Sequence, residues 1–137
     1  MFKDESRKEF IEPTSIYWDV INELREKINV NGLMHITGGA FTKIKGILPK
    51  NADAIISNPL KPDEIFIDIY NKGLSDEIMY KTFNCSNGFV ISVNDNDLGE
   101  CLSFINNKFS TQLIGEVIKG DGNIVINSKF SDKSIIY

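Results

Sequence analysis

The chain has 137 residues, 42% of them hydrophobic, and a formal net charge of −4. This length fits one domain with a single core, and the acidic balance argues against a broad nucleic-acid-binding surface. No run of about 18 apolar residues predicts a membrane-spanning helix, and the first residues lack the apolar segment of a signal peptide. We therefore expect a cytoplasmic protein that binds neither nucleic acid nor a membrane.

The sequence offers little to a metal ion. It has one histidine and two cysteines, Cys85 and Cys101, whose placement fits neither a disulfide framework nor a zinc site. We expect no metal site built by this chain. Cys85 would act as a nucleophile only if a base lowered its pKa. No base stands beside it in the sequence, so we expect a small buried residue.

The N-terminal part is predicted to hold an arm and a helix. Residues 1–10 are charged and are interpreted as an arm, and residues 11–137 as one domain. Glu12-Pro13-Thr14-Ser15 is typical of a helix entry, with Thr14 or a neighbour as the cap. Apolar residues then recur at helical spacing from Ile16 to Ile28. Asn31-Gly32 is expected to stop this helix.

The middle of the chain predicts one strand and two helices. Residues 52–57 have the composition of a strand. A helix is predicted over residues 64–72, with Pro62 near its start and Gly73 as its stop. Ser75 is the expected cap of a second helix that extends toward Phe83.

The C-terminal part is predicted to alternate strands with one amphipathic helix. A strand over residues 89–93 is followed by a stripe of apolar residues that we expect to be buried against the sheet. Two strands, 113–118 and 123–127, are joined by Gly120-Asp121-Gly122, which has the composition of a hairpin loop. The tail, 128–137, is either loose or an added edge strand. The apolar stripe consists of Leu98, Cys101, Leu102, Ile105 and Phe109.

This order of elements predicts an α/β protein of the α+β type, in which helices flank a mixed, mostly antiparallel sheet.

Small and polar residues gather at two breaks in the predicted structure. The first holds the only histidine, His35, followed by Thr37-Gly38-Gly39. Paired glycines let the main-chain N–H groups approach an anion, and a histidine can donate to a phosphate. The second is the loop from Asn84 to Gly88, where Asn84 either binds a ligand or caps the preceding helix. An ordinary glycine turn is the alternative for the first, and a single site requires the fold to bring both together.

Segments that contain these residues occur in the order, and at nearly the spacing, of a known enzyme family. The segments are Glu12-Pro13-Thr14, His35-Ile36-Thr37-Gly38-Gly39, Ile47-Leu48-Pro49, Glu77-Ile78-Met79-Tyr80-Lys81-Thr82-Phe83-Asn84 and Ile114-Gly115-Glu116. They resemble the C-terminal domain of phosphoribosylformylglycinamidine cyclo-ligase (AIR synthase) and of related proteins in its superfamily. The similarity extends from about Ile11 to Ile126.

The resemblance implies a role in purine biosynthesis. Members of that family close the imidazole ring of a purine precursor: ATP phosphorylates a formamide oxygen, an internal nitrogen attacks, and phosphate leaves. The implied cofactors, ATP and Mg²⁺, are bound mostly by an N-terminal domain outside this sequence. The expected partners are that domain or subunit, a phosphoribosyl small molecule, and in some settings a second copy of the chain in a homodimer.

The same resemblance assigns roles to individual residues. His35 is expected to be catalytic, orienting or protonating the phosphate or formyl end of the substrate. Thr37, Gly38, Gly39, Asn84 and Gly88 are expected to bind the substrate or its phosphate. We expect the domain to be inactive on its own, because no glycine-rich loop with a lysine is present to hold the phosphates of ATP.

The chain departs from the family at three places. Ala40 replaces a glycine, Ser86 replaces the first glycine of an F-N-x-G-x-G loop, and residues 43–46 stand where a longer E-N-I-P-R stretch is usual. These departures favour an alternative: a stand-alone nucleotide- or phosphoribosyl-binding protein that has this fold and no catalytic activity.

Overall fold

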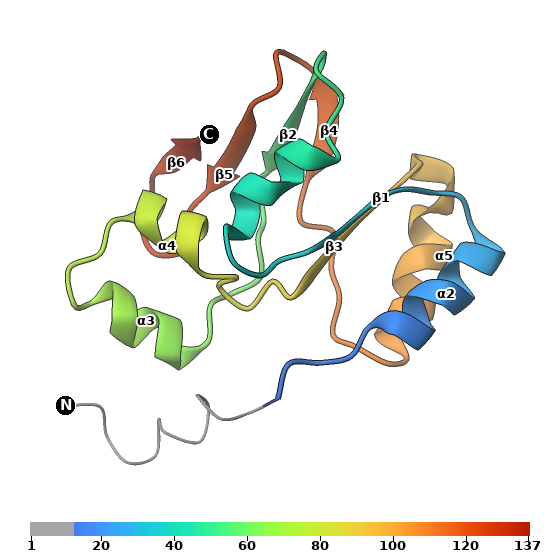
Figure 1. Cartoon of the computed structure of the whole chain (residues 1–137), viewed down its shortest axis with the longest axis horizontal. Coiled ribbons are helices and arrows are strands. Elements are labelled where there is room, and N and C mark those ends of the chain that lie inside the picture. Colours follow the sequence, from blue (N-terminus) through green and yellow to red (C-terminus); the bar gives the residue numbers. More distant parts are fainter. Residues whose placement is uncertain (1–12) are drawn as a thin grey trace.

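The computed structural model describes residues 13–137 (Figure 1), so the predicted arm over residues 1–10 lies outside the described residues. The elements are α2 (Trp18–Lys27), β1 (Val30–His35), the 3₁₀ helix η2 (Ala40–Gly46), β2 (Ala52–Ile56), α3 (Glu64–Tyr70), α4 (Asp76–Thr82), β3 (Phe89–Val93), α5 (Asp95–Asn106), β4 (Glu116–Lys119), β5 (Ile124–Asn127) and β6 (Ser134–Ile136).

The strands form two sheets. β1 and β3 make an antiparallel pair, and the second sheet has the order β4-β2-β5-β6. Within it β2 runs parallel to β5, whereas the β2–β4 and β5–β6 pairs are antiparallel. The predicted fold class, helices with mixed and mostly antiparallel strands, is confirmed. The division into two sheets was not predicted.

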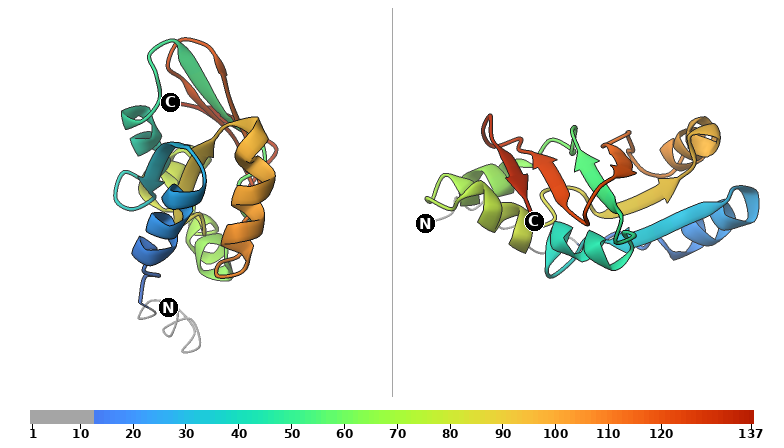
Figure 2. Two further views of the ribbon diagram at one scale, coloured as in Figure 1. Left: turned by 90° about the vertical axis from the view of Figure 1, so that its right-hand side faces the viewer. Right: turned by 90° about the horizontal axis from the view of Figure 1, so that it is seen from above.

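Two hydrophobic clusters hold the described residues together. α2 and α5 lie side by side next to the β1–β3 pair (Figure 2), and Val20, Leu24, Ile28, Cys101 and Ile105 form their shared core. The larger cluster lies between the four-stranded sheet, η2 and α4. β1 and β3 contribute to both clusters. In β3, neighbouring residues face opposite sides, so Val90 packs against the larger cluster and Ile91 against the smaller one. In β1, Met34 packs against the larger cluster and Val30 against the smaller one, with the register shift between Val30 and Gly32 separating them.

Three local predictions are corrected. α2 begins at Trp18, and its N-cap is Tyr17, which makes no side-chain capping bond. Asn31 and Gly32 do not stop the helix, which already ends at Lys27. They lie in β1, where the pairing register with β3 shifts. The predicted stripe on α5 is buried only at Cys101 and Ile105.

The predicted hairpin around Gly120-Asp121-Gly122 is also wrong. β4 and β5 do not pair, because β2 lies between them. The loop instead crosses the start of β2, and Asp53 holds it there. One carboxylate oxygen of Asp53 accepts the backbone N–H groups of Asp121, Gly122 and Asn123 at 2.8–3.0 Å. These three bonds lower the pKa of the Asp53 carboxyl, the bond from Asn123 contributing most.

Candidate functional site

The turn after β1 has left-handed backbone angles and free space beside its main chain. Gly39 has a φ of +81° and Ala40 a φ of +43°, a conformation that glycine adopts without a steric penalty. The turn closes through a bond from the Ala40 N–H to the Thr37 carbonyl. Space at Gly38 is open, since a Cβ placed there would meet no atom within 4 Å. A ligand can therefore approach the main chain at this turn.

A lysine from the following helix reaches back to the same turn. The Lys43 ammonium donates to the Thr37 hydroxyl at 2.8 Å and to the His35 carbonyl at 3.1 Å. Its aliphatic chain passes close to Gly39, 3.4 Å from where a Cβ would stand. Sequence reasoning did not select Lys43 as a site residue, although its position early in a short helix that begins beside the turn is a usable signal.

The imidazole of His35 belongs to a group of aromatic rings. It stacks on Phe89 with ring centroids 5.8 Å apart and meets Tyr17 edge-on at 5.7 Å. Tyr17 in turn lies 5.0 Å from Phe109. Within residues 13–137 the imidazole has ring contacts and no hydrogen bond, and the charged side chain bonded to the turn is that of Lys43.

The loop that precedes β3 is held mainly by its own side chains. The Asn84 amide oxygen accepts the Ser86 N–H at 3.1 Å. The buried Asn87 donates to the Cys85 carbonyl and accepts the Leu60 N–H. Asn84 therefore shapes its own loop, and among the described residues its side chain makes no bond that caps α4. Ligand binding by Asn84 stays a prediction. α4 ends at Thr82 with Phe83 as its C-cap, close to the predicted end of this helix.

The fold brings the two breaks together, as a single site requires. The Ile36 N–H donates to the Gly88 carbonyl at 3.0 Å, and His35 is the register partner of Phe89. Gly88 lies against Tyr17, because a Cβ at position 88 would overlap the Tyr17 hydroxyl and would displace this ring. The turn of residues 37–39 and the loop of residues 84–88 thus adjoin at the same end of the β1–β3 pair.

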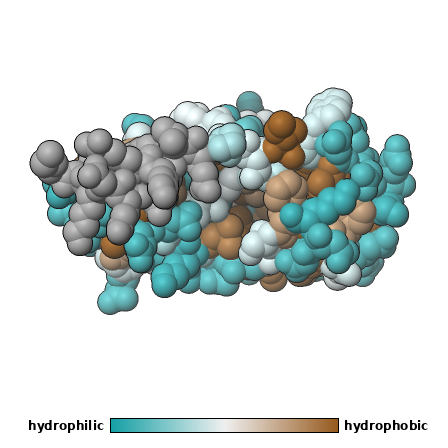
Figure 3. Space-filling model, turned by 90° about the horizontal axis from the view of Figure 1, so that it is seen from below, coloured by the Kyte–Doolittle hydropathy of each residue, from teal (hydrophilic) through white to brown (hydrophobic). Residues whose placement is uncertain are grey.

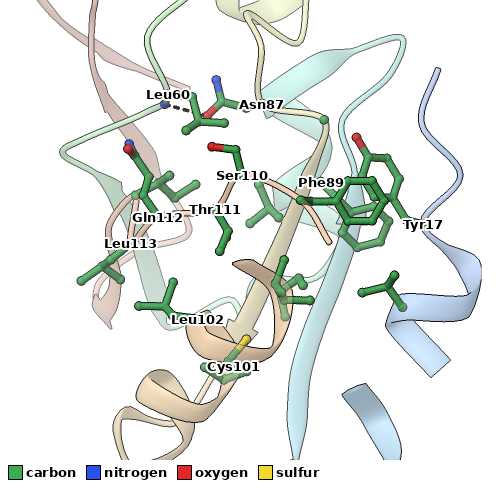
Figure 4. Close-up of a pocket in the computed structure, with 18 of the residues that line it drawn as sticks. Tyr17, Leu60, Asn87, Phe89, Cys101, Leu102, Ser110, Thr111, Gln112 and Leu113 are labelled. Atoms are coloured by element: carbon green, nitrogen blue, oxygen red, sulfur yellow. Dashed lines mark hydrogen bonds between the residues drawn. The ribbon is translucent and has the colours of Figure 1, made fainter. Parts of the chain in front are cut away.

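A pocket of about 230 Å³ opens beside this loop, on the face of β3 that α5 covers (Figure 4). Its lining combines Phe89 and Leu102 with Ser110 and Thr111 from the segment after α5, and Tyr17 lies at one side. In Figure 3, which views the molecule from below, apolar side chains lie between hydrophilic ones on this surface. The sequence did not predict that Tyr17 lines this pocket, because its apolar spacing assigned the residue to the helix.

The side chains near the site limit its chemistry. Burial raises the pKa of the Cys85 thiol to about 12, so this thiol is protonated and unreactive near neutral pH. This agrees with the prediction of a small buried residue. In the described part of the chain, no three His, Cys, Asp or Glu side chains come close enough together to hold a metal ion. No helix there is long and apolar enough to cross a membrane.

Comparison with known proteins identifies a family whose model matches most of this chain. The domain described as "AIR synthase related protein, C-terminal domain" matches residues 3–127. A phosphoribosylformylglycinamidine cyclo-ligase of Thermodesulfovibrio yellowstonii is 38% identical over 117 residues, which cover 82% of this chain and 34% of that enzyme. One of Methanocaldococcus jannaschii is 37% identical over 140 residues, which cover 94% of this chain and 39% of that enzyme. The chain thus spans little more than a third of the length of these relatives.

Proposed function

This chain belongs to the AIR synthase related protein family as a C-terminal domain, and we propose that it is the substrate-side domain of an ATP-dependent phosphoribosylformylglycinamidine cyclo-ligase. The observation that carries the proposal is the adjacency of the turn 37–39 and the loop 84–88. The two family segments that bear the expected site residues meet through the bond from Ile36 to Gly88. The reaction is that of the relatives, which are phosphoribosylformylglycinamidine cyclo-ligases.

We propose that the Thr37-Gly38-Gly39 turn receives the phosphate of a phosphoribosyl substrate and that Gly88 borders the same site. His35 is proposed to orient the substrate from its place against Phe89. Asn84 is proposed to act through its loop, since its amide oxygen is already bonded to Ser86. Open space at Gly38 supports the first assignment.

ATP and Mg²⁺ are assigned to a different part of the enzyme. This assignment follows the family resemblance, and the net charge of −4 supports it, because the chain has no excess of cations to hold a triphosphate. An N-terminal domain or subunit is therefore the proposed partner. A homodimer is the alternative assembly, and the cytoplasm is the proposed compartment.

The departures from the family pattern do not exclude catalysis. Ala40 and Ser86, which replace glycines, have φ values of +43° and +68°, so both keep the backbone conformation that glycine favours. The alternative, a binding protein without catalysis, rests on the same two residues and on the shortened stretch at residues 43–46.

The test is a chimera in which this chain replaces the C-terminal third of the Thermodesulfovibrio yellowstonii relative. We expect ATP-dependent ring closure of formylglycinamidine ribonucleotide by the chimera and none by the isolated chain. Thr37→Val in the chimera should lower turnover, and Lys72→Met, at an exposed position just after α3, serves as the surface control. A folded chimera that binds ATP and yet forms no product would contradict the proposal and favour the binding-protein alternative.

A further inference from the structure

Lys43 is a charged residue whose side chain is bonded directly to the turn of residues 37–39. Its ammonium is bonded to two neutral oxygens, the Thr37 hydroxyl and the His35 carbonyl. Within residues 13–137 it forms no ion pair, the recorded one being between Lys108 and Glu23. An ammonium has three N–H donors, so one donor remains beside an open turn.

The bond to Thr37 fixes what that hydroxyl can do. A lysine ammonium only donates hydrogen bonds, so the Thr37 oxygen must be the acceptor. The hydroxyl hydrogen is then left to donate elsewhere. Gly38, the next residue, faces open space, so an incoming oxygen can reach this side of the turn.

The side chain of Lys43 packs against Gly39. Its Cγ and Cδ atoms lie 3.4 and 3.7 Å from the place of a Cβ on Gly39, which is ordinary van der Waals contact. The left-handed φ of Gly39, +81°, is what favours glycine at this turn. Thr42 reinforces it, because its hydroxyl donates to the Gly39 carbonyl at 2.6 Å.

We infer that Lys43 is a positioning residue of the site. Its ammonium holds the turn in place before a ligand binds, through the bonds to His35 and Thr37. It leaves the Thr37 hydroxyl free to donate a hydrogen bond to the ligand. It also places a positive charge where an anionic oxygen of the ligand would bind. The ligand class is a phosphate monoester, which accepts several charge-assisted hydrogen bonds. This inference rests on the proposed function.

The test measures phosphate binding by the shifts of the Gly38 and Gly39 amide resonances in NMR spectra, with inorganic phosphate and ribose 5-phosphate as probes. Lys43→Met keeps a long, unbranched side chain and removes the positive charge. It should weaken binding about tenfold, as expected for the loss of a charge-assisted bond. Lys43→Arg should keep binding within about threefold, because it retains charge and donors. Lys45→Met, on an exposed neighbour of the same short helix, should bind as the parent does.

Equal binding by Lys43→Met and the parent would overturn the inference. If the parent binds neither probe, the phosphate-binding part of the proposed function fails. The positioning role of Lys43 is then tested by hydrogen exchange in the protein without ligand. There, amide hydrogen exchange at residues 37 and 40, whose N–H groups are hydrogen-bonded within the turn, should be faster in Lys43→Met than in Lys45→Met, with Lys43→Arg restoring protection. Unchanged exchange would overturn the positioning role, and unshifted β1–β3 resonances verify that each variant is folded.

Discussion

Single residues at the site adopt conformations that the surrounding contacts must compensate. Ser86 has a φ of +68°, which costs about 1–3 kcal/mol for a residue other than glycine. Its hydroxyl donates to the Asp63 carboxylate at 2.6 Å and accepts the Asp63 N–H at 2.8 Å. These reciprocal bonds explain how serine replaces the glycine of the family pattern without changing the course of the backbone.

The thiol of Cys85 makes stability depend on pH. Burial raises its pKa from 9.0 to about 12, so the folded state holds this proton more tightly than the unfolded state. The thiol's contribution is complete below about pH 9 and is lost as the pH rises toward 12, by up to about 1.4 kcal/mol per pH unit. Urea unfolding of Cys85→Ala and the parent at pH 8 and pH 10 should show a flatter pH dependence for the variant. Equal slopes would mean that the thiol is accessible to water.

Asn87 is predicted to be the most sensitive polar residue of the loop. Its side chain is 2% exposed and bonds to Leu60, Asn84 and Cys85. Asn87→Ala should lower the free energy of unfolding by about 2–4 kcal/mol, because buried backbone groups lose their partners. Asn96→Ala, at an exposed position of α5, should change it by less than about 0.5 kcal/mol. A comparable loss in both variants would contradict the assigned network.

At the scale of elements, a buried carboxylate joins the C-terminal segment to the helices. Asp76, at the start of α4, is 1% exposed and accepts hydroxyl bonds from Tyr70, Ser128 and Ser131. Burial by itself raises its pKa, but the three hydroxyl donors outweigh burial, so the pKa lies below 3.8. Its stabilising contribution is therefore present above about pH 4 and is lost as the pH falls through the lowered pKa.

Asp76→Ala should loosen β6, because the segment that leads to it loses this attachment. We expect a loss of about 1–3 kcal/mol in urea unfolding and faster amide exchange at residues 134–136. Asp132→Ala removes an exposed carboxylate of the same segment and should have neither effect. Undisturbed exchange at β6 in Asp76→Ala would show that strand pairing with β5 suffices.

The contact between α2 and α5 is predicted to depend on Leu24, which is fully buried in their shared cluster. Leu24→Ala should cost about 2–5 kcal/mol, the range for large-to-small changes in a core. Ile16 is 81% exposed, so Ile16→Ala should cost less than about 0.5 kcal/mol. Guanidinium unfolding measures both, and a small loss for Leu24→Ala would place α2 away from α5.

At the scale of the whole molecule, the proposed division of labour between domains can be tested by whether the isolated chain binds Mg²⁺–ATP. We expect no binding of Mg²⁺–ATP to the isolated chain in calorimetric titrations, because the proposal assigns ATP and Mg²⁺ to another domain and a net charge of −4 leaves no excess of cations to hold the triphosphate. Micromolar binding would contradict the assignment of ATP to another domain. It would also favour the alternative of a stand-alone nucleotide-binding protein.

The sequence by itself determined the features whose signals are local. Ser75 caps α4 through its bond to the Ile78 N–H, as predicted, and Gly73 ends the region of α3 with a φ of +100°. β2 and β3 occupy nearly the predicted ranges. The order of the family segments was equally readable, because each is a short run of side chains.

Only the tertiary structure decided how distant segments meet. The pattern around residues 120–122 fits a hairpin, but β2 pairs with both neighbouring strands and separates them, because strand pairing depends on partners far away in the chain. Tyr17 fits the apolar period of a helix, yet its ring packs against Phe89 and Phe109 outside that helix. In the sequence Lys43 is indistinguishable from a solvated surface lysine. Its proposed positioning role follows from the fold, because η2 places its ammonium against Thr37 and the His35 carbonyl. No local pattern encodes these contacts, since their stability comes from surfaces that form only when the chain has folded.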